Sequence, residues 1–191
     1  TQRMGGPFWW QVGLGGDLYG KTLGILGLGS IGQKIAKYGQ AFGMRVIAWS
    51  ENLTPERAAE TGVSWVSKRE LFEQADVLSI HLVLSDRSRG LVDAEALGWM
   101  KPAAHLVNTA RGPIVDEAAL IDALANGRLA GAALDVYAQE PLPAGHPFRQ
   151  LPNVLATPHV GYVSEQNYRQ FYEQMIEDIQ AWAKGVPVRA L

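Results

Sequence analysis

Six short apolar runs, separated by stretches with helical spacing, constrain most strongly what this 191-residue chain can fold into. The runs are continuous rather than alternating, which is typical of strands buried on both faces of a parallel sheet. Strand–helix alternation of this kind predicts an α/β fold: a doubly wound, Rossmann-type parallel sheet in three αβα layers. The expected strands cover residues 22–26, 45–49, 77–82, 105–109, 131–136 and 153–157.

The stretches between these runs carry signals for the start and end of helices. Thr54 is followed by a proline and predicts an N-cap with proline at the first helical position. Ser67 and Glu70 have the spacing of a capping box. Asp116 is the expected cap of a helix that ends at the Asn-Gly pair of residues 126–127.

The last long element runs from about residue 164 to residue 184. Its apolar side chains recur at helical spacing and define one stripe, which predicts a helix that packs on its own domain. The segment before residue 20 has no clear period, and we expect its aromatic side chains to pack against something outside this chain. The stripe consists of Tyr168, Phe171, Tyr172, Met175, Ile176, Ile179 and Trp182, and the N-terminal aromatics include Trp9, Trp10 and Tyr19.

Composition excludes several functional classes. A net charge of -2 gives no reason to expect a nucleic-acid or membrane partner. The chain has no cysteine, which excludes disulfides, thiolate catalysis and cysteine-based metal sites and fits a reducing compartment. No apolar run approaches the roughly 20 residues that a membrane span needs. We therefore expect a cytoplasmic protein that holds no metal.

A glycine-rich turn follows the first expected strand. Gly27, Gly29 and Gly32 match the pattern G-x-G-x-x-G and open a helix, which is the context that a dinucleotide site requires. The first glycine permits the tight turn, the second lets the backbone approach a pyrophosphate, and the third allows close helix–strand packing. The N–H groups around Ser30 and Ile31 are the expected anion donors.

The end of the second expected strand bears on whether the cofactor is NAD or NADP. An acid normally stands there and bonds the ribose 2′-hydroxyl, but this strand ends on Ser50, eighteen residues after Gly32. Glu51 comes next and disfavours a 2′-phosphate if it points inward, whereas Arg57 is within reach from the following helix. We favour NAD, with NADP as the rival.

Polar residues follow several of the other strands, whose carboxyl ends should meet at one edge of the sheet. Each has an ordinary structural explanation by itself, as a solvated arginine, a turn acid or a satisfied loop histidine. Their convergence favours a site. They include His81 and Val83 after the third strand, Asn108, Thr109 and Arg111 after the fourth, Asp135 and Glu140 after the fifth, and His159 after the sixth.

Four stretches resemble the D-isomer-specific 2-hydroxyacid dehydrogenases in order, spacing and residue type. They are GKTLGILGLGSIGQKIA (20–36), NTARGPIVDEAAL (108–120), AALDVYAQEP (132–141) and LPNVLATPHVGY (151–162). The resemblance extends from about residue 18 to residue 186. It implies a cofactor-binding domain of an enzyme that moves a hydride between NAD or NADP and a 2-hydroxy acid.

The resemblance also implies a role for individual residues. Arg111 matches the arginine that binds the substrate carboxylate, His159 the acid–base group, and Glu140 its carboxylate partner. Asp135 matches a residue near the nicotinamide carboxamide. The full set expected at the cofactor is Gly27, Gly29, Ser30, Ile31, Gly32, Ser50, Val83, Thr109, Ala110, Arg111, Asp135, His159 and Gly161.

In the resembled family a second domain binds the substrate. We therefore expect residues 1–191 to be the dinucleotide-binding domain, with residues 1–19 left from an inter-domain segment and the substrate domain absent. Such a chain should bind cofactor with little turnover, and family members commonly form homodimers through this domain. Two alternatives stay open: a cofactor-sensing module similar to the family's corepressors, and a Rossmann enzyme with unrelated chemistry.

Overall fold

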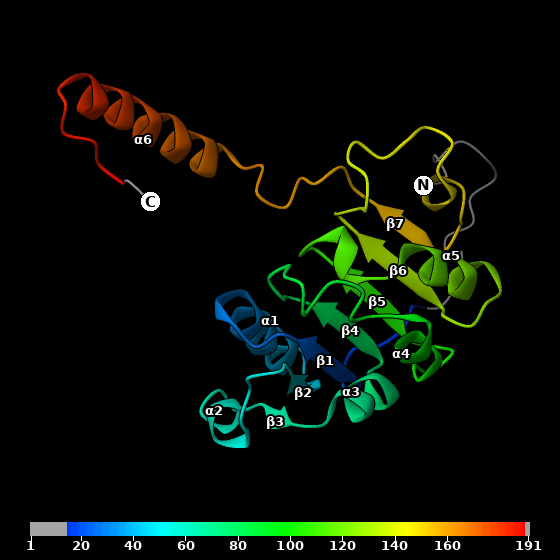
Figure 1. The fold of residues 1–191 in the computed structure, drawn as a ribbon. Helices are drawn as coiled ribbons and strands as arrows, with labels where there is room; N and C mark the ends of the chain where they lie inside the picture. Colours follow the sequence, from blue (N-terminus) through cyan, green and yellow to red (C-terminus); the bar gives the residue numbers. More distant parts are fainter. Residues whose placement is uncertain (1–14, 190–191) are drawn as a thin grey trace, which may run out of the picture.

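The computed structural model describes residues 15–189 and shows a parallel sheet with helices on both faces (Figure 1). The seven strands lie in the order β3-β2-β1-β4-β5-β6-β7, so the chain begins near the middle and winds outward in both directions. This confirms the doubly wound fold predicted from the sequence. The strands are β1 Thr22–Leu26, β2 Arg45–Trp49, β3 Ser64–Trp65, β4 Val77–Ile80, β5 His105–Asn108, β6 Gly131–Leu134 and β7 Val154–Ala156.

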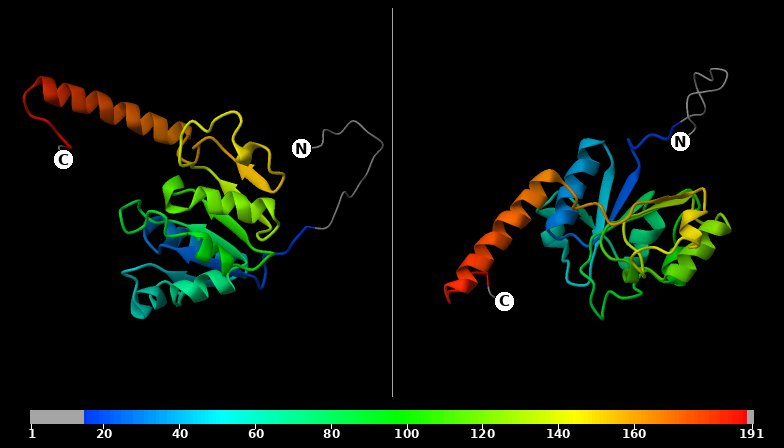
Figure 2. Two further views of the ribbon diagram at one scale, coloured as in Figure 1. Left: turned by 45° about the vertical axis from the view of Figure 1, so that its right-hand side comes forward. Right: turned by 90° about the horizontal axis from the view of Figure 1, so that it is seen from above.

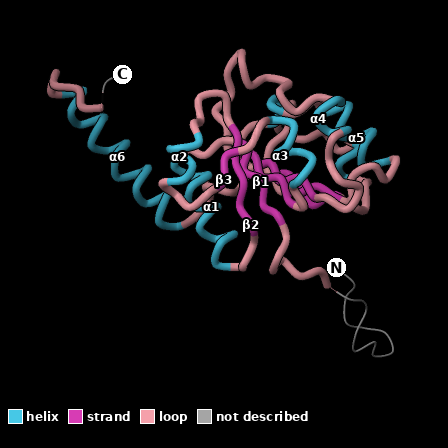
Figure 3. Tube along the Cα trace, turned by 90° about the horizontal axis from the view of Figure 1, so that it is seen from below, coloured by secondary structure: helices cyan, strands magenta, loops and turns pink. Residues whose placement is uncertain are grey.

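Helices form the two outer layers. The right-handed rule for parallel crossovers places the helices of the β1–β2–β3 half on one face and those leading to β4, β5 and β6 on the other. Contacts between α3 and α4 and between α4 and α5 agree with this arrangement, which Figure 3 shows from below. The helices are α1 Ser30–Ala41, α2 Pro55–Ala59, α3 Lys68–Gln74, α4 Ala94–Gly98, α5 Glu117–Ala125 and α6 Glu165–Ala183.

Buried side chains lie on both sides of the sheet. In β1, Leu23 and Ile25 pack in one cluster with Ala36 of α1. Their neighbour Leu26 belongs to the larger cluster on the opposite side, with Phe72 of α3. Successive residues of a strand point to opposite faces, so the continuous apolar runs reflect burial on both faces, as predicted.

The predicted helix caps are confirmed. The hydroxyl of Thr54 accepts the N–H of Arg57 at 3.3 Å, and Ser67 forms a reciprocal capping box with Glu70. Asp116 caps α5, whose C-cap Asn126 is followed by a glycine with φ +67°. Local sequence therefore determines where these helices begin and end.

β3 was not predicted from the sequence, and several strands are shorter than predicted. β3 contains two residues, which is too short to give a periodic signal. The predicted runs 77–82, 105–109 and 131–136 leave the sheet at Ile80, Asn108 and Leu134. Their last residues turn into loops at the carboxyl edge, where the polar side chains lie.

The prediction that the last helix packs on its own domain is wrong. α6 has the expected bounds, but none of its side chains is buried, and Figures 1 and 2 show it projecting away from the sheet. Ile179 is 64% exposed and Trp182 74% exposed. A helical period shows that one face is apolar, but not what covers that face. Of the N-terminal aromatics, Trp9 and Trp10 lie outside the described residues, whereas Tyr19 is exposed.

None of the helices within residues 15–189 has the length and apolar character needed to cross a membrane.

Candidate functional site

A cavity of about 470 Å³ opens at the carboxyl edge of the sheet. It is lined by the turn containing Gly27 and Gly29, by residues 49–53 with Arg57, and by residues between 81 and 91. Because β1 pairs with both β2 and β4, the direction of winding reverses at this point. Doubly wound sheets bind ligands at such a reversal, and the volume suits a small organic molecule.

The glycine turn has the geometry that its sequence pattern predicts. Gly27 has φ +103°, a conformation that favours glycine. A Cβ on Gly32 would lie 2.1 Å from the carbonyl oxygen of Gly27, so only glycine lets α1 pack this close to the strand. A Cβ on Gly29 would meet no described atom within 4 Å, and α1 begins at the next residue, Ser30. The N–H groups of the first turn therefore face outward where an anion can approach.

Most of the other residues expected at the cofactor lie around this edge. Val83 and Ser50 line the cavity with the glycines, and Val83 is 85% exposed. Thr109 and Ala110 lie just after β5, and Gly161 is exposed beyond β7.

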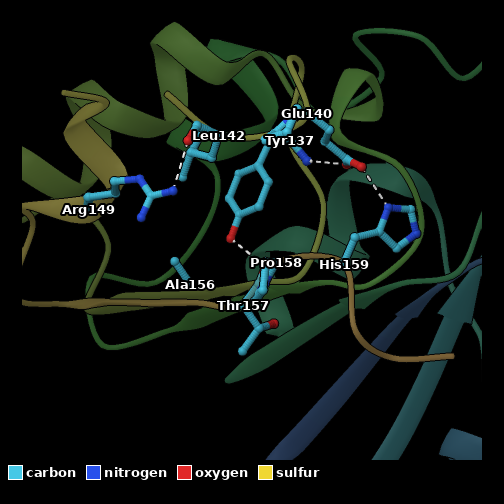
Figure 4. Close-up of a pocket in the computed structure, with 9 residues that line it drawn as sticks. Tyr137, Glu140, Leu142, Arg149, Ala156, Thr157, Pro158 and His159 are labelled. Atoms are coloured by element: carbon cyan, nitrogen blue, oxygen red, sulfur yellow. Dashed lines mark hydrogen bonds and ion pairs between the residues drawn. The ribbon is translucent and has the colours of Figure 1, made fainter. Parts of the chain in front are cut away.

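His159 and Glu140 form a hydrogen-bonded pair beside a second cavity, of about 490 Å³ (Figure 4). The imidazole Nδ1 lies 2.6 Å from the Glu140 Oε2, and both side chains are 35% exposed. The other carboxylate oxygen accepts the Tyr137 N–H at 2.9 Å, so the carboxylate is fixed from two sides. With Nδ1 bound to the carboxylate, Nε2 is the nitrogen available for proton exchange.

The pKa of Glu140 is lowered. Burial acts to raise it, but hydrogen bonds from His159 and the Tyr137 N–H, together with nearby positive charge that includes Arg111, outweigh burial. Glu140 is therefore ionised at neutral pH and suited to stabilise an imidazolium.

The backbone at His159 adopts φ +54°, in the left-handed region that side chains other than glycine rarely occupy. The neighbouring residues are held by one carboxylate: Asp135 accepts the N–H groups of Val160 at 2.9 Å and Gly161 at 2.8 Å. It also accepts the hydroxyl of Thr157 at 2.5 Å. Backbone strain persists only where surrounding contacts enforce it, so Asp135 holds the turn that presents His159. A contact of Asp135 with the nicotinamide stays a prediction.

Replacing Asp135 with asparagine is expected to destabilise the fold by about 2 kcal/mol at pH 7, the scale of a hydrogen bond to a charged group. Burial acts to raise the Asp135 pKa, but the three donors outweigh it and bring the pKa below its ordinary value of 3.8. A carboxylate with a lowered folded-state pKa stabilises the fold fully above its unfolded pKa, and this contribution is lost as pH falls through the folded value.

Urea unfolding of wild type and Asp135→Asn measures this effect. The difference in unfolding free energy should be constant near neutrality and shrink below about pH 4. Asp86→Asn, a change at an exposed aspartate, is the control and should leave stability unchanged. An Asp135→Asn difference that does not depend on pH would contradict the assigned role.

The loop that carries Arg111 lies at the same edge, where its backbone packs closely against a neighbouring loop. A Cβ on Gly112 would lie 2.0 Å from the carbonyl carbon of Tyr137, so only glycine lets this loop pack against the segment leading to Glu140. Asn108, buried at 1% exposure, accepts the Ala110 N–H and donates to the Arg111 carbonyl, both at 3.0 Å. The Arg111 side chain is exposed. Arg111, Glu140 and His159 therefore lie on loops at the same edge of the sheet, and their roles in binding and catalysis stay predictions.

Several supporting residues were not predicted from the sequence. The hydroxyl of Tyr137 shares its one hydrogen between the carbonyls of Leu134 at 3.0 Å and Thr157 at 2.8 Å and so joins the ends of β6 and β7. Glu117 accepts the Ala138 N–H at 3.2 Å and pairs with His146 at 3.1 Å. Apart from the bond between Tyr137 and Leu134, these contacts join residues distant in sequence. Arg87 also lines the cofactor cavity. The sequence indicates this residue only weakly, because it lies in a run of polar residues after β4.

Within residues 15–189, no three His, Asp or Glu side chains gather as a metal site would require.

Comparison with known proteins agrees with the geometry. Residues 3–161 match the family model described as D-isomer specific 2-hydroxyacid dehydrogenase, NAD binding domain. The chain is 44% identical to the D-3-phosphoglycerate dehydrogenase of Bacillus subtilis over 92% of its own length and 33% of that protein. It is 42% identical to the glyoxylate reductase of Aeropyrum pernix, over 93% of this chain and 55% of that protein.

A solved structure of similar fold is the phosphoglycerate oxidoreductase of Vibrio cholerae. It superimposes with a TM-score of 0.86 at 42% identity, over 91% of this chain and 56% of that one. The chain thus spans between a third and just over half of the length of these relatives. The match to the family model, over residues 3–161, covers the glycine turn and the loops that carry Arg111, Glu140 and His159. The chain belongs to the D-isomer specific 2-hydroxyacid dehydrogenase family, and it contains that family's NAD-binding domain.

Proposed function

We propose that the complete protein transfers a hydride between NAD(P) and C2 of a 2-hydroxy or 2-keto acid. The observation that carries this proposal is the His159–Glu140 pair at 2.6 Å, held on the same sheet edge as Arg111 and the glycine-turn cavity. An acid–base pair, a cation for a carboxylate and a dinucleotide-type turn are the parts that such a reaction needs.

Each side chain then has a defined task. The bound nicotinamide supplies the hydride for reduction and accepts it for oxidation. In reduction, His159 donates a proton from Nε2 to the substrate oxygen, and in oxidation it removes that proton. Glu140 stabilises the imidazolium formed in the second case. Arg111 binds the substrate carboxylate through its planar fork and polarises the adjacent carbonyl.

A panel of small 2-keto acids, including glyoxylate and hydroxypyruvate, assayed on the complete protein with NADH and with NADPH, tests this function. We expect cofactor oxidation with at least one acid of the panel. Cofactor binding without oxidation by any of them would favour the sensing-module alternative. A homodimer and a cytoplasmic location stay predictions.

We also propose that the complete protein has a substrate domain that covers α6. The helix begins six residues after His159, and a row of aromatic contacts leads to it: His159 packs edge-on against Tyr162, which stacks on Tyr168. Its apolar stripe is exposed, and the relatives are nearly two to three times longer than this chain. An exposed apolar face of this kind marks an interaction site. The domain that completes the cleft is the occupant that best fits a helix next to the acid–base residue.

One substitution compared in two contexts tests this arrangement. Ile179→Asp is expected to lower the stability of the complete protein by about 2 kcal/mol, the scale of losing a buried aliphatic side chain. The same change should leave the unfolding of the 191-residue chain unaltered, because α6 buries none of its side chains there. Gln170→Asp, on the exposed polar face, is the matched control. Equal effects of Ile179→Asp in both contexts would contradict the proposal.

A further inference from the structure

The first residue after β2 at the cofactor cavity is not the acid expected there. β2 ends at Trp49, whose carbonyl accepts the Gly27 N–H at 2.9 Å, so the next residue stands directly beside the glycine turn. That residue is Ser50, which is half-buried, and its carbonyl accepts the Leu53 N–H at 3.0 Å in a turn away from the sheet. An acid at this position would bond the ribose hydroxyls and repel a phosphate, whereas a hydroxyl can donate to either group.

Two arginines from different elements line the same cavity. Arg57 comes from α2, and Arg87 comes from the loop after β4. In the described part of the chain, neither guanidinium forms an ion pair or a hydrogen bond with another side chain. Arginine with open donors is the side chain best suited to bind a phosphate, because its planar fork matches two phosphate oxygens.

The loop carrying Arg87 is held in place by its own hydrogen bonds. The buried Ser88 donates to the Val83 carbonyl at 2.7 Å and accepts the Ser85 N–H at 2.8 Å. Arg87 thus extends from a loop whose backbone is fixed next to the glycine turn. A fixed backbone reduces the conformational entropy lost when the side chain binds.

The charge of this cavity favours an anion. Its charged lining residues are Arg57, Arg87 and Glu51, two positive and one negative. His81 adds no charge at neutral pH, because burial lowers its pKa below the ordinary value of 6.5, and its ring bonds the Ser79 hydroxyl at 2.8 Å. Glu51, Arg57 and Arg87 are all exposed, so solvent screens the three charges alike and leaves one net positive charge among them.

We propose that this cavity accepts the 2′-phosphate of NADP(H), with Arg57 and Arg87 as its cationic ligands and Ser50 at the position where a carboxylate would exclude it. The domain then binds NADPH at least as tightly as NADH, in contrast to the preference for NAD inferred from the sequence. This inference rests on the proposed function, since it assigns a selectivity to the same cofactor site.

Equilibrium titrations of the 191-residue chain with NADH and NADPH, followed by nicotinamide fluorescence, test the assignment without requiring turnover. Arg57→Ala and Arg87→Ala are each expected to weaken NADPH binding about tenfold, the lower end of a charge-assisted hydrogen bond, and to leave NADH binding within about twofold. Ser50→Asp should weaken NADPH binding by at least as much. Arg169→Ala, which removes an exposed arginine on α6, is the matched control and should change neither affinity.

The outcomes separate this inference from the proposed function. Wild-type binding of NADH tighter than that of NADPH would overturn the 2′-phosphate site and leave the dehydrogenase proposal intact. Arginine variants that weaken both cofactors equally would also overturn the site, since a 2′-phosphate ligand acts on NADPH alone. Failure of the wild-type chain to bind either cofactor would overturn both proposals.

Discussion

Replacing His159 with glutamine is expected to lower kcat of the complete protein by a factor of about 100 or more, the scale of general acid–base catalysis. Glutamine retains a polar group that can bond the Glu140 carboxylate, but it has no nitrogen that takes up and releases a proton near neutral pH. Steady-state rates in both directions measure the loss, and NADH titration checks that the cofactor still binds.

A histidine at the opposite edge of the sheet provides the control. His105 begins β5, at the end of the strand opposite the carboxyl edge, and is exposed. His105→Gln should leave kcat unchanged. Near-normal turnover in His159→Gln would remove His159 from the acid–base role, while an equal loss in both variants would point to a general effect of removing a histidine.

Gly112→Ala should destabilise the fold by about 3 kcal/mol or more, at the upper end of the effect of overpacking. The new Cβ would lie 2.0 Å from the carbonyl carbon of Tyr137 and 2.5 Å from the Ala138 nitrogen, and both are backbone atoms. A backbone cannot rotate aside as a side chain can, so the two loops must separate. For a chain of this length the loss corresponds to a fall in Tm of roughly 6–12 °C.

The same change should also impair the reaction, because the separated loops carry Arg111 and Glu140. We expect kcat/KM of the complete protein to fall by more than tenfold at temperatures where the variant stays folded, since small misplacements in a site are costly. Gly98→Ala is the control: a Cβ there meets no described atom within 4 Å and its φ is not positive. It should be neutral or slightly stabilising. A Gly112→Ala protein with wild-type Tm would show that the packing argument is wrong.

The fold followed from the sequence because its signals are local. A strand, a helix cap or a glycine turn can each be predicted from a few neighbouring residues. This holds for the continuous apolar runs, for the caps Thr54 and Asp116, and for the turn at Gly27. β3 escaped detection because a two-residue strand has no period. The exposure of the apolar stripe of α6 was also not predicted. The stripe has the same sequence pattern whether its own domain or another domain covers it.

The site was predictable as a set of residues, but its support was not. Arg111, Glu140 and His159 were named because each follows a strand and matches the family pattern, and the parallel sheet brings those strand ends to one edge. Sequence gave no indication that Asp135 holds the His159 turn, or that Glu117 braces the segment before Glu140. These contacts join residues more than twenty positions apart, and no local pattern encodes them.

The sequence by itself therefore determined the order of elements, the glycine turn and the residue types that chemistry requires, because periodicity and backbone conformation are local properties. Only the tertiary structure decided the 2.6 Å pairing of His159 with Glu140 and the strained turn that presents the imidazole. It also decided the meeting of Ser50, Arg57 and Arg87 around one cavity. Ser50, Arg57 and Arg87 meet because β2 and β4 flank β1, an arrangement that is set by the packing of the whole sheet.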